Sequence, residues 1–287
     1  MSKKISLLLF VIAMVASVFF FANASKAGQN ADSVWQNITI SVKGFSMEDA
    51  QKVRMQEGCP VFTAWTEKEG QTVADPKLGK SIQTNIVYLS GSSELVLPAE
   101  PVFFAQDENG CLVATRTAWE LFGSAEVVGQ EIKVDHQICM IRGIVNAPQT
   151  GIYMQASASM ENVSFQRITL EGKDTEAGNN FLLRYGVDGT VIRMDYLRSL
   201  KSLTELVPGK WSDFDGWKAN WKLRKEELRR IRKMHKNNIE YYYEKQCQIF
   251  LSEMGLGIFC ILIAAGTLER TVYKYFEKLL ALILDEC

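Results

Sequence analysis

Apolar and polar residues alternate in short blocks between residues 38 and 185, and these blocks predict both strands and helices. The alternation is typical of a strand at residues 38–42. A helix is expected at residues 47–57, because Ser46 suits an N-cap, acidic residues fill the first turn and Gly58 suits the end. Further strands are expected at residues 61–65, 82–89, 111–114, 131–134, 137–145 and 163–170.

Two more helices are expected in the same region, at residues 115–122 and 176–185. Thr115 suits the cap of the first and Gly123 suits its end. The strands at 131–134 and 137–145 are expected to form a hairpin that turns at residues 135–136. Strands and helices mixed in this way favour an α+β domain with a mixed sheet over residues 30–215.

Two long apolar runs flank this domain. The first, residues 5–21, follows two lysines and precedes Ala22-Asn23-Ala24, a pattern typical of an export signal. Its length lies between that of a signal peptide and that of a spanning helix, so residues 1–24 are expected to be either a signal cleaved after Ala24 or a retained anchor. Either form places the following domain outside the cytoplasm.

The second run predicts a transmembrane helix at residues 247–267. Its weak point is Glu253, which is tolerable only near an interface. Three tyrosines at 241–243 suit the aromatic belt of a membrane interface. A core helix of a soluble domain is the alternative interpretation.

The pattern turns helical from Trp217 onward, and an amphipathic helical stalk is expected at residues 216–246. Residues 268–287 are expected to form a short amphipathic tail that lies along the inner membrane face or meets an ATPase. Residues 222–236 carry a basic run, which suits either a solvated stalk face or binding of anionic lipid headgroups. The positive-inside rule would place this run in the cytoplasm, against the topology that the first apolar run favours.

Composition adds a few limits. The chain has 287 residues, of which 47% are hydrophobic, so it can bury a sizeable core. Its net charge of −1 gives no sign of a nucleic-acid partner. Six cysteines show no metal-ligand spacing. Cys111 and Cys139 flank one compact α+β unit and are the candidate disulfide, with free buried thiols as the alternative.

Candidate catalytic groups are few, and no cofactor or metal is expected. His136 and His235 are expected at solvated positions, and Ser46 lacks the second glycine of a nucleophile elbow. Residues 74–81 match a permissive phosphate loop, but a polar segment precedes them and a strand follows them. The chain is therefore expected not to be an enzyme, with a secreted hydrolase as a remote alternative.

Four segments carry a family resemblance. They are residues 107–114 (DENGCLVA), 117–124 (TAWELFGS), 127–132 (VVGQEI) and 141–145 (IRGIV). Together they resemble the periplasmic core domain of MacB-type ABC transporter permeases, in which a helix ends in a Leu-Phe-Gly turn and a hairpin follows. The order of anchor, domain and returning helix is similar as well. The residues that match are structural in character: Leu121, Phe122, Gly123, Gly129 and Gly143.

The resemblance implies a binding and force-relay domain whose ATP hydrolysis belongs to a separate ATPase. MacB-type permeases have four transmembrane helices, whereas two are expected here. We therefore expect a component of, or accessory to, an ABC-type export or mechanotransmission complex, placed in the plasma membrane with its main domain extracytoplasmic. Its expected partners are an ABC ATPase subunit, other permease or envelope proteins and membrane lipid. A stand-alone cell-surface module that binds or senses a ligand is the alternative.

Overall fold

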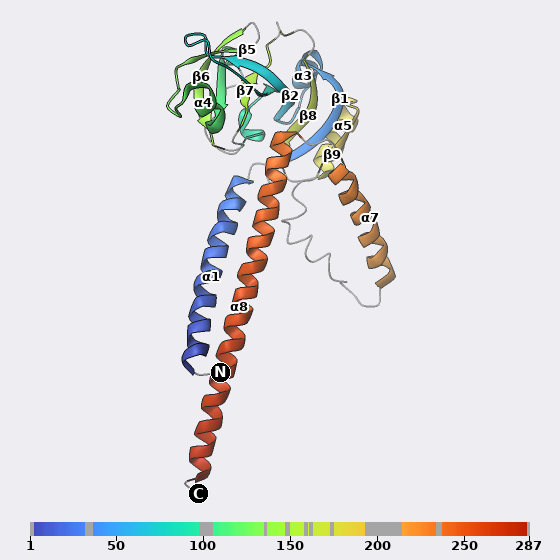
Figure 1. Cartoon of the computed structure of the whole chain (residues 1–287). Helices are drawn as coiled ribbons and strands as arrows, with labels where there is room; N and C mark the ends of the chain where they lie inside the picture. Colours follow the sequence, from blue (N-terminus) through green and yellow to red (C-terminus); the bar gives the residue numbers. More distant parts are fainter. Residues whose placement is uncertain are drawn as a thin grey trace. The chain divides into compact units, whose positions relative to one another are not determined.

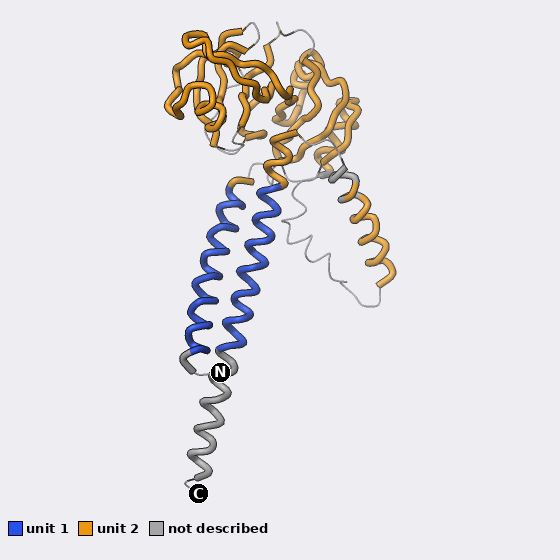
Figure 2. Tube along the Cα trace, viewed as in Figure 1, with its two compact units in different colours: residues 1–29, 245–287 blue, residues 30–244 orange. Residues whose placement is uncertain are grey.

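The computed structural model describes residues 3–31, 37–97, 106–134, 137–146, 150–157, 160, 163–172, 175–192, 214–233 and 237–285. The chain divides into two compact units. Unit 1 contains residues 1–29 and 245–287, and unit 2 contains residues 30–244 (Figure 2).

Unit 2 is built on one mixed sheet of nine strands, in the order β3-β7-β4-β6-β5-β2-β8-β1-β9. The strands are β1 (Asn37–Ser46), β2 (Phe62–Ala74), β3 (Ser81–Ser90), β4 (Gly110–Ala114), β5 (Glu131–Val134), β6 (Gln137–Val145), β7 (Ile152–Gln155), β8 (Ser164–Glu171) and β9 (Gly189–Ile192). The pairs β3–β7 and β4–β6 are parallel, and the other pairs are antiparallel. With its helices, this sheet confirms the expected α+β class.

The long strand β2 connects two halves of the sheet. Residues 62–65 of β2 pair with β8, while residues 73–74 pair with β5 (Figure 1). The same strand also pairs with β3, so β2, β3, β7, β4, β6 and β5 close into a ring. The expected strand at 61–65 was therefore too short. Its continuation is polar and largely exposed at residues 67–72, and it contains a register shift between Lys68 and Gln71.

Four described helices and one 3-10 turn belong to unit 2 beside the sheet. They are α3 (Met47–Arg54), η1 (Ser93–Leu95), α4 (Thr115–Phe122), α5 (Thr175–Tyr185) and α7 (Phe214–Lys233). The Ser46 side chain accepts from the Asp49 amide at 3.1 Å and the Asp49 carboxylate accepts from the Ser46 amide at 3.0 Å, a capping box that confirms the predicted start of α3. The helix ends at Arg54, three residues before the expected end.

The motif helix α4 has its predicted bounds, but Thr115 is not its N-cap. Its N-cap is Ala114, with no side-chain cap, and Thr115 is the first helical residue. The Thr115 hydroxyl instead donates to the Val145 carbonyl at 3.2 Å. The helix ends as predicted at Gly123, which has a φ of 71°, a left-handed conformation that glycine adopts without strain. A local end signal was thus correct where the start signal was not.

Helices and strands bury one continuous apolar core. It includes fully buried side chains from β1, β3, β4, β6, β7 and β8, among them Ile40, Ile86, Ile141 and Phe165. The described residues of the expected stalk region 216–246 lie in two helices, and residues 234–236 of it are outside the described residues. The first, α7, ends at Lys233, and α8 (Asn238–Asp285) begins after Asn237. The expected tail at 268–287 continues α8 as far as Asp285.

Unit 1 contains α1 (Lys3–Asn30) up to residue 29 and α8 from residue 245. The Ser6 hydroxyl donates to the Thr267 carbonyl at 3.3 Å. Nearer the other end of α1, the Phe21 ring packs against Gly257. A Cβ atom on Gly257 would lie only 2.9 Å from the Phe21 Cζ atom. The two helices are therefore antiparallel, and Gly257 permits their close approach.

By length and composition, two described helices are able to cross a membrane. They are Ile5–Asn30 in α1 and Asn238–Thr267 in α8. Both coincide with the apolar runs of the sequence analysis. A signal sequence passes the same test for the first of them.

Candidate functional site

The start of α8 is bonded to unit 2 by several polar side chains. Asn237 caps the helix: its side-chain oxygen accepts from the Glu240 amide at 2.9 Å. The Glu240 carboxylate in turn accepts from the Asn237 amide at 3.3 Å. This reciprocal pair is a capping box, and it fixes where the helix begins.

The carboxylate of Glu240 also pairs with Arg167 of β8. The Arg167 Nε atom donates to one carboxylate oxygen and Nη2 donates to the other at 3.0 Å. Both side chains are buried, with 8% and 5% of their surfaces exposed. The Nη1 atom donates to the Ser41 hydroxyl at 3.1 Å and to the Gln166 carbonyl at 3.1 Å. A bidentate pair with these additional partners is the arrangement that offsets burial of two charges.

Strand pairing determines where Arg167 lies. Its backbone is opposite Ser41 of β1 on one side and opposite Trp65 of β2 on the other. Arg167 is thus central in the half of the sheet formed by β2, β8 and β1. The ion pair therefore joins α8 to the middle of this half and not to an edge strand.

A second carboxylate, Glu67 of β2, bonds the same helix start. One oxygen of Glu67 accepts from the backbone amide of Asn238 at 2.7 Å, and the other accepts from the Asn85 side chain at 2.7 Å. Burial raises the pKa of Glu67, although both hydrogen bonds oppose this change. A carboxylate at a helix N-terminus is also favoured by the helix dipole.

Two further residues of α8 complete the contact. Ile239 and Tyr243 are buried, and the Tyr243 hydroxyl donates to the Val96 carbonyl at 2.9 Å. Together with Glu240 they have the spacing of one helix face. The first turns of α8 are therefore bonded to β8, to β2 and to the segment after η1. We call Glu67, Arg167, Asn237, Asn238, Ile239, Glu240 and Tyr243 the docking site.

The sequence analysis did not identify the docking site. Residues 163–170 were correctly expected as a strand, but Arg167 was not singled out, and Glu240 was included in the stalk. One signal was available: Asn237-x-x-Glu240 is a capping box that stands shortly before an apolar run. The partner of Glu240 is 73 residues away in the chain, so no local pattern could indicate it.

The motif residues singled out from the resemblance lie around α4 and β6. Leu121 is fully buried and Phe122 packs against the same core. Gly129 has a φ of 85°, and its amide donates to the Ile141 carbonyl at 2.8 Å, so it forms a turn that joins β6. Gly143 lies within β6, opposite Leu112, beside a register shift. These positions are structural, and their assignment as motif residues stays a prediction.

Near the same motif, an exposed ion pair anchors the loop before β4. The Arg142 Nε atom donates to Asp107 at 2.7 Å. A Cβ atom at Gly110 would lie 2.4 Å from the Asp107 carboxylate, so a larger residue there would displace this ion pair. The structure thus gives Asp107, in the first segment of the motif, a charged partner on β6.

Cys111 and Cys139 are buried on β4 and β6, and both thiols are free in this structure. Burial raises the pKa of Cys139 to about 11, and it raises the pKa of Cys111 well above its ordinary value. Their pairing as a disulfide stays a prediction.

The phosphate-loop resemblance at residues 74–81 is a hairpin connection. Residue Ala74 ends β2 and Ser81 begins β3. Between them, the Asp75 carboxylate accepts from the amides of Lys77 and Leu78 at 2.8 and 3.2 Å. The Asp75 carboxylate thus occupies the amides that would bind a phosphate. A strand follows this turn, whereas a phosphate loop is followed by a helix, so the geometry is not that of a phosphate loop.

His136 and His235 lie outside the described residues. Among the residues that the structure does describe, no group of three or more His, Cys, Asp or Glu side chains is placed to hold a metal ion. The docking site contains acids, an arginine and a tyrosine, all of them bonded to protein groups. These bonds hold the start of α8 on the sheet.

No protein-family model matches the sequence, and no curated protein matches it. Three solved structures are similar in fold. One is the extracellular domain of the noncanonic ABC-type transporter YknZ from Gram-positive bacteria, with 12% identity, a TM-score of 0.42, and coverage of 54% of this chain and 99% of that one. Another is the periplasmic region of MacB from Actinobacillus actinomycetemcomitans, with 16% identity, a TM-score of 0.46, and coverage of 64% and 100%.

The third structure is a domain of a protein described as a permease, from Porphyromonas gingivalis. It has 12% identity, a TM-score of 0.38, and coverage of 56% of this chain and 91% of that one.

Proposed function

We propose that this chain is a membrane-anchored component of, or accessory to, an ABC-type transporter complex. Its main domain would lie outside the plasma membrane and bind a partner or substrate, and it would pass conformational change to a membrane helix. The proposal includes no catalytic step in the chain itself. An ABC ATPase subunit is the partner it requires.

The observation that carries the proposal is the docking site. The residues that bond α8 to the sheet, Asn238 to Tyr243, are the first turns of the same uninterrupted helix that contains the second candidate span. A ligand that alters the sheet around Arg167 therefore acts on the beginning of that helix. Coupling between the domain and the membrane needs an element that makes different contacts in two states, and α8 is placed to be that element.

The motif at residues 107–146 supports the class of complex. Its order of strand, helix, Gly123 turn and hairpin is the order that resembles MacB-type permeases, and the structure has these elements as β4, α4, β5 and β6. The two candidate spans flank the domain as an anchor and a returning helix would.

The test is a pull-down of the tagged full chain in mild detergent, with identification of the proteins recovered. We expect an ABC ATPase to be recovered, and we expect deletion of residues 268–287 to abolish its recovery. A matched variant, in which the exposed residues Lys77, Lys80 and Lys133 are replaced with alanine, should recover the ATPase normally. Recovery of the chain alone, from cells and detergents that keep other ABC complexes intact, would contradict the proposal and favour a stand-alone ligand-binding module.

A further inference from the structure

Three aromatic rings lie along one side of α7. The ring centroids of Phe214 and Trp217 are 5.2 Å apart, and those of Trp217 and Trp221 are 6.2 Å apart. The two indoles are nearly parallel, with an angle of 11° between their planes. Spacings of three and four residues put these side chains on one face of the helix, and we call the three residues the aromatic stripe.

A line of basic residues runs beside the aromatic stripe. Lys218, Lys222, Lys225 and Arg229 are all exposed and follow one another at steps of four, three and four residues. Lys218 and Lys222 each follow a tryptophan directly, so the basic line is displaced from the aromatic stripe by about 100° around the helix. The Lys225 ammonium lies 5.3 Å from the centre of the Trp221 ring, at the border of the two.

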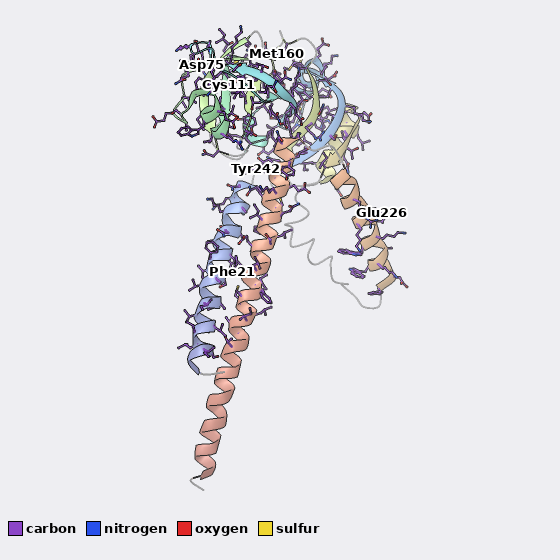
Figure 3. The ribbon with its side chains drawn as sticks, in the orientation of Figure 1. Phe21, Asp75, Cys111, Met160, Glu226 and Tyr242 are labelled. Atoms are coloured by element: carbon purple, nitrogen blue, oxygen red, sulfur yellow. The ribbon has the colours of Figure 1, made fainter. Side chains whose placement is uncertain are left out.

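Positive charge is concentrated on this helix. Residues 214–233 contain eight Lys or Arg and three Asp or Glu, in a chain whose net charge is −1. Glu226 marks α7 in Figure 3. The helix thus combines a strong positive field with large aromatic side chains, whereas a merely solvated stalk needs only the charges.

We infer that α7 is an interfacial helix that binds the surface of an anionic phospholipid bilayer. Helices that lie in a membrane surface have an aromatic or apolar side for the acyl boundary and Lys or Arg residues beside it for the headgroups. Tryptophan favours the same depth. Anionic headgroups match the charge of the basic line.

The position of α7 in the chain argues for a bilayer over other anionic occupants. Only residues 234–246 separate its last residue, Lys233, from the apolar run of α8 that begins at residue 247. A membrane that takes up this span is consequently within a short length of chain. Inorganic polyphosphate would use the basic line, but it has no apolar group to contact the aromatic stripe.

The inference does not depend on the proposed function, since no ATPase is involved. It is tested with the full chain reconstituted in nanodiscs of phosphatidylcholine, with or without about one quarter phosphatidylglycerol, at low ionic strength. A doxyl-labelled lipid quenches tryptophans that reach the acyl boundary. The signal of Trp217 and Trp221 is obtained as the difference from a W217F/W221F variant.

We expect phosphatidylglycerol to increase this quenching about twofold or more, because each Lys or Arg near an anionic surface is attracted to it. The variant K218E/K222E/K225E should lose the increase, and so should the wild type at high salt. The variant K77E/K80E/K133E, which changes net charge equally at exposed residues of the sheet, should keep it. Both variants alter exposed side chains only, and equal thermal unfolding temperatures will show that they fold.

Equal quenching in the two lipids would overturn the inference, as would an increase that survives K218E/K222E/K225E. If both charge variants lose the increase in quenching, the increase depends on net charge alone, and this result would overturn the inference as well. Competition by soluble polyphosphate without any lipid quenching would make a soluble polyanion the occupant, against the inference.

Discussion

Arg167 on β8 and Glu240 on α8 form a bidentate ion pair inside the protein, although 73 residues separate them in the chain. Each partner has further hydrogen bonds, Arg167 to Ser41 and Glu240 to the Asn237 amide. Removal of one partner would leave the other as an uncompensated buried charge.

We therefore expect Arg167→Met or Glu240→Gln to lower the free energy of unfolding by about 3–5 kcal/mol. The double variant R167M/E240Q should be less destabilised than the two single losses summed, because it leaves no buried charge. Thermal or urea unfolding of the full chain in detergent measures these differences.

The exposed pair Arg116–Glu120 is the control for that experiment. Its side chains are 67% and 45% exposed, so Arg116→Ala should cost only about 0–0.5 kcal/mol. Equal small losses for both pairs would show that the buried pair does not hold α8.

The capping box of α3 makes a pH-dependent contribution. Hydrogen bonds from the Ser46 amide and hydroxyl lower the pKa of Asp49 below the ordinary carboxyl value. The folded state thus favours the charged carboxylate, so its stabilisation is complete above the unfolded pKa and is lost as pH falls through the lowered pKa. We expect Ser46→Ala to cost about 1 kcal/mol at neutral pH and less at strongly acidic pH.

Unfolding curves of wild type and Ser46→Ala across this pH range measure the difference. Ser92→Ala, at the cap of the short η1 turn, is a control without an acidic partner in a capping box. A difference that stays constant with pH would contradict the role of Asp49.

The thiols of Cys111 and Cys139 should be unreactive in the folded protein. Both are fully buried, and burial raises the pKa of Cys139 to about 11 and that of Cys111 well above its ordinary value, which disfavours the reactive thiolate. Titration with a thiol reagent in buffer should spare both.

Titration in denaturant, with and without a reductant, then tests the pairing. If reduction increases the number of reactive thiols by two in the wild type, and by none in the Cys111→Ser variant, the disulfide is established. An unchanged number would establish free thiols. Rapid reaction of either thiol in the folded protein would contradict their burial.

Gly257 and Gly255 give a matched pair of substitutions in the second candidate span. A Cβ at Gly257 would approach the Phe21 ring to 2.9 Å, whereas one at Gly255 would meet nothing within 4 Å. We expect Gly257→Leu to weaken the packing of α1 on α8 by about 1–3 kcal/mol and Gly255→Leu to have little effect.

Thermal unfolding of the full chain in nanodiscs measures both. The comparison also bears on cleavage after Ala24, because the contact exists only while α1 remains attached. Identical behaviour of the two variants, with a mature protein that starts near Ser25, would establish a signal peptide in place of an anchor.

Elements whose signals are local were predicted from the sequence. The hairpin of β5 and β6 has its expected bounds, and Gly123 ends α4, since alternation and a left-handed glycine act over a few residues. The polar part of β2 was missed because residues 67–72 are largely exposed and show no buried face. The short strands β7 and β9, with four residues each, were missed because pairing and not propensity makes them strands.

The docking site could not be predicted in the same way. Glu67, Arg167 and Glu240 are brought together by the pairing of β2 with β8 and by the position of α8, and each looks like an ordinary surface residue in its own segment. Burial of charged groups depends on partners distant in the chain, which a single sequence does not specify.

One consequence concerns the carboxylate of Glu240, which serves both the capping box of α8 and the bond to Arg167. If α8 leaves the sheet, Glu240 loses its buried partner, and if the first turn of α8 unwinds, the carboxylate leaves Arg167. Detachment of α8 from the sheet and unwinding of its first turn are therefore coupled. We expect the docking site to change between two discrete states, bonded and released, instead of loosening gradually.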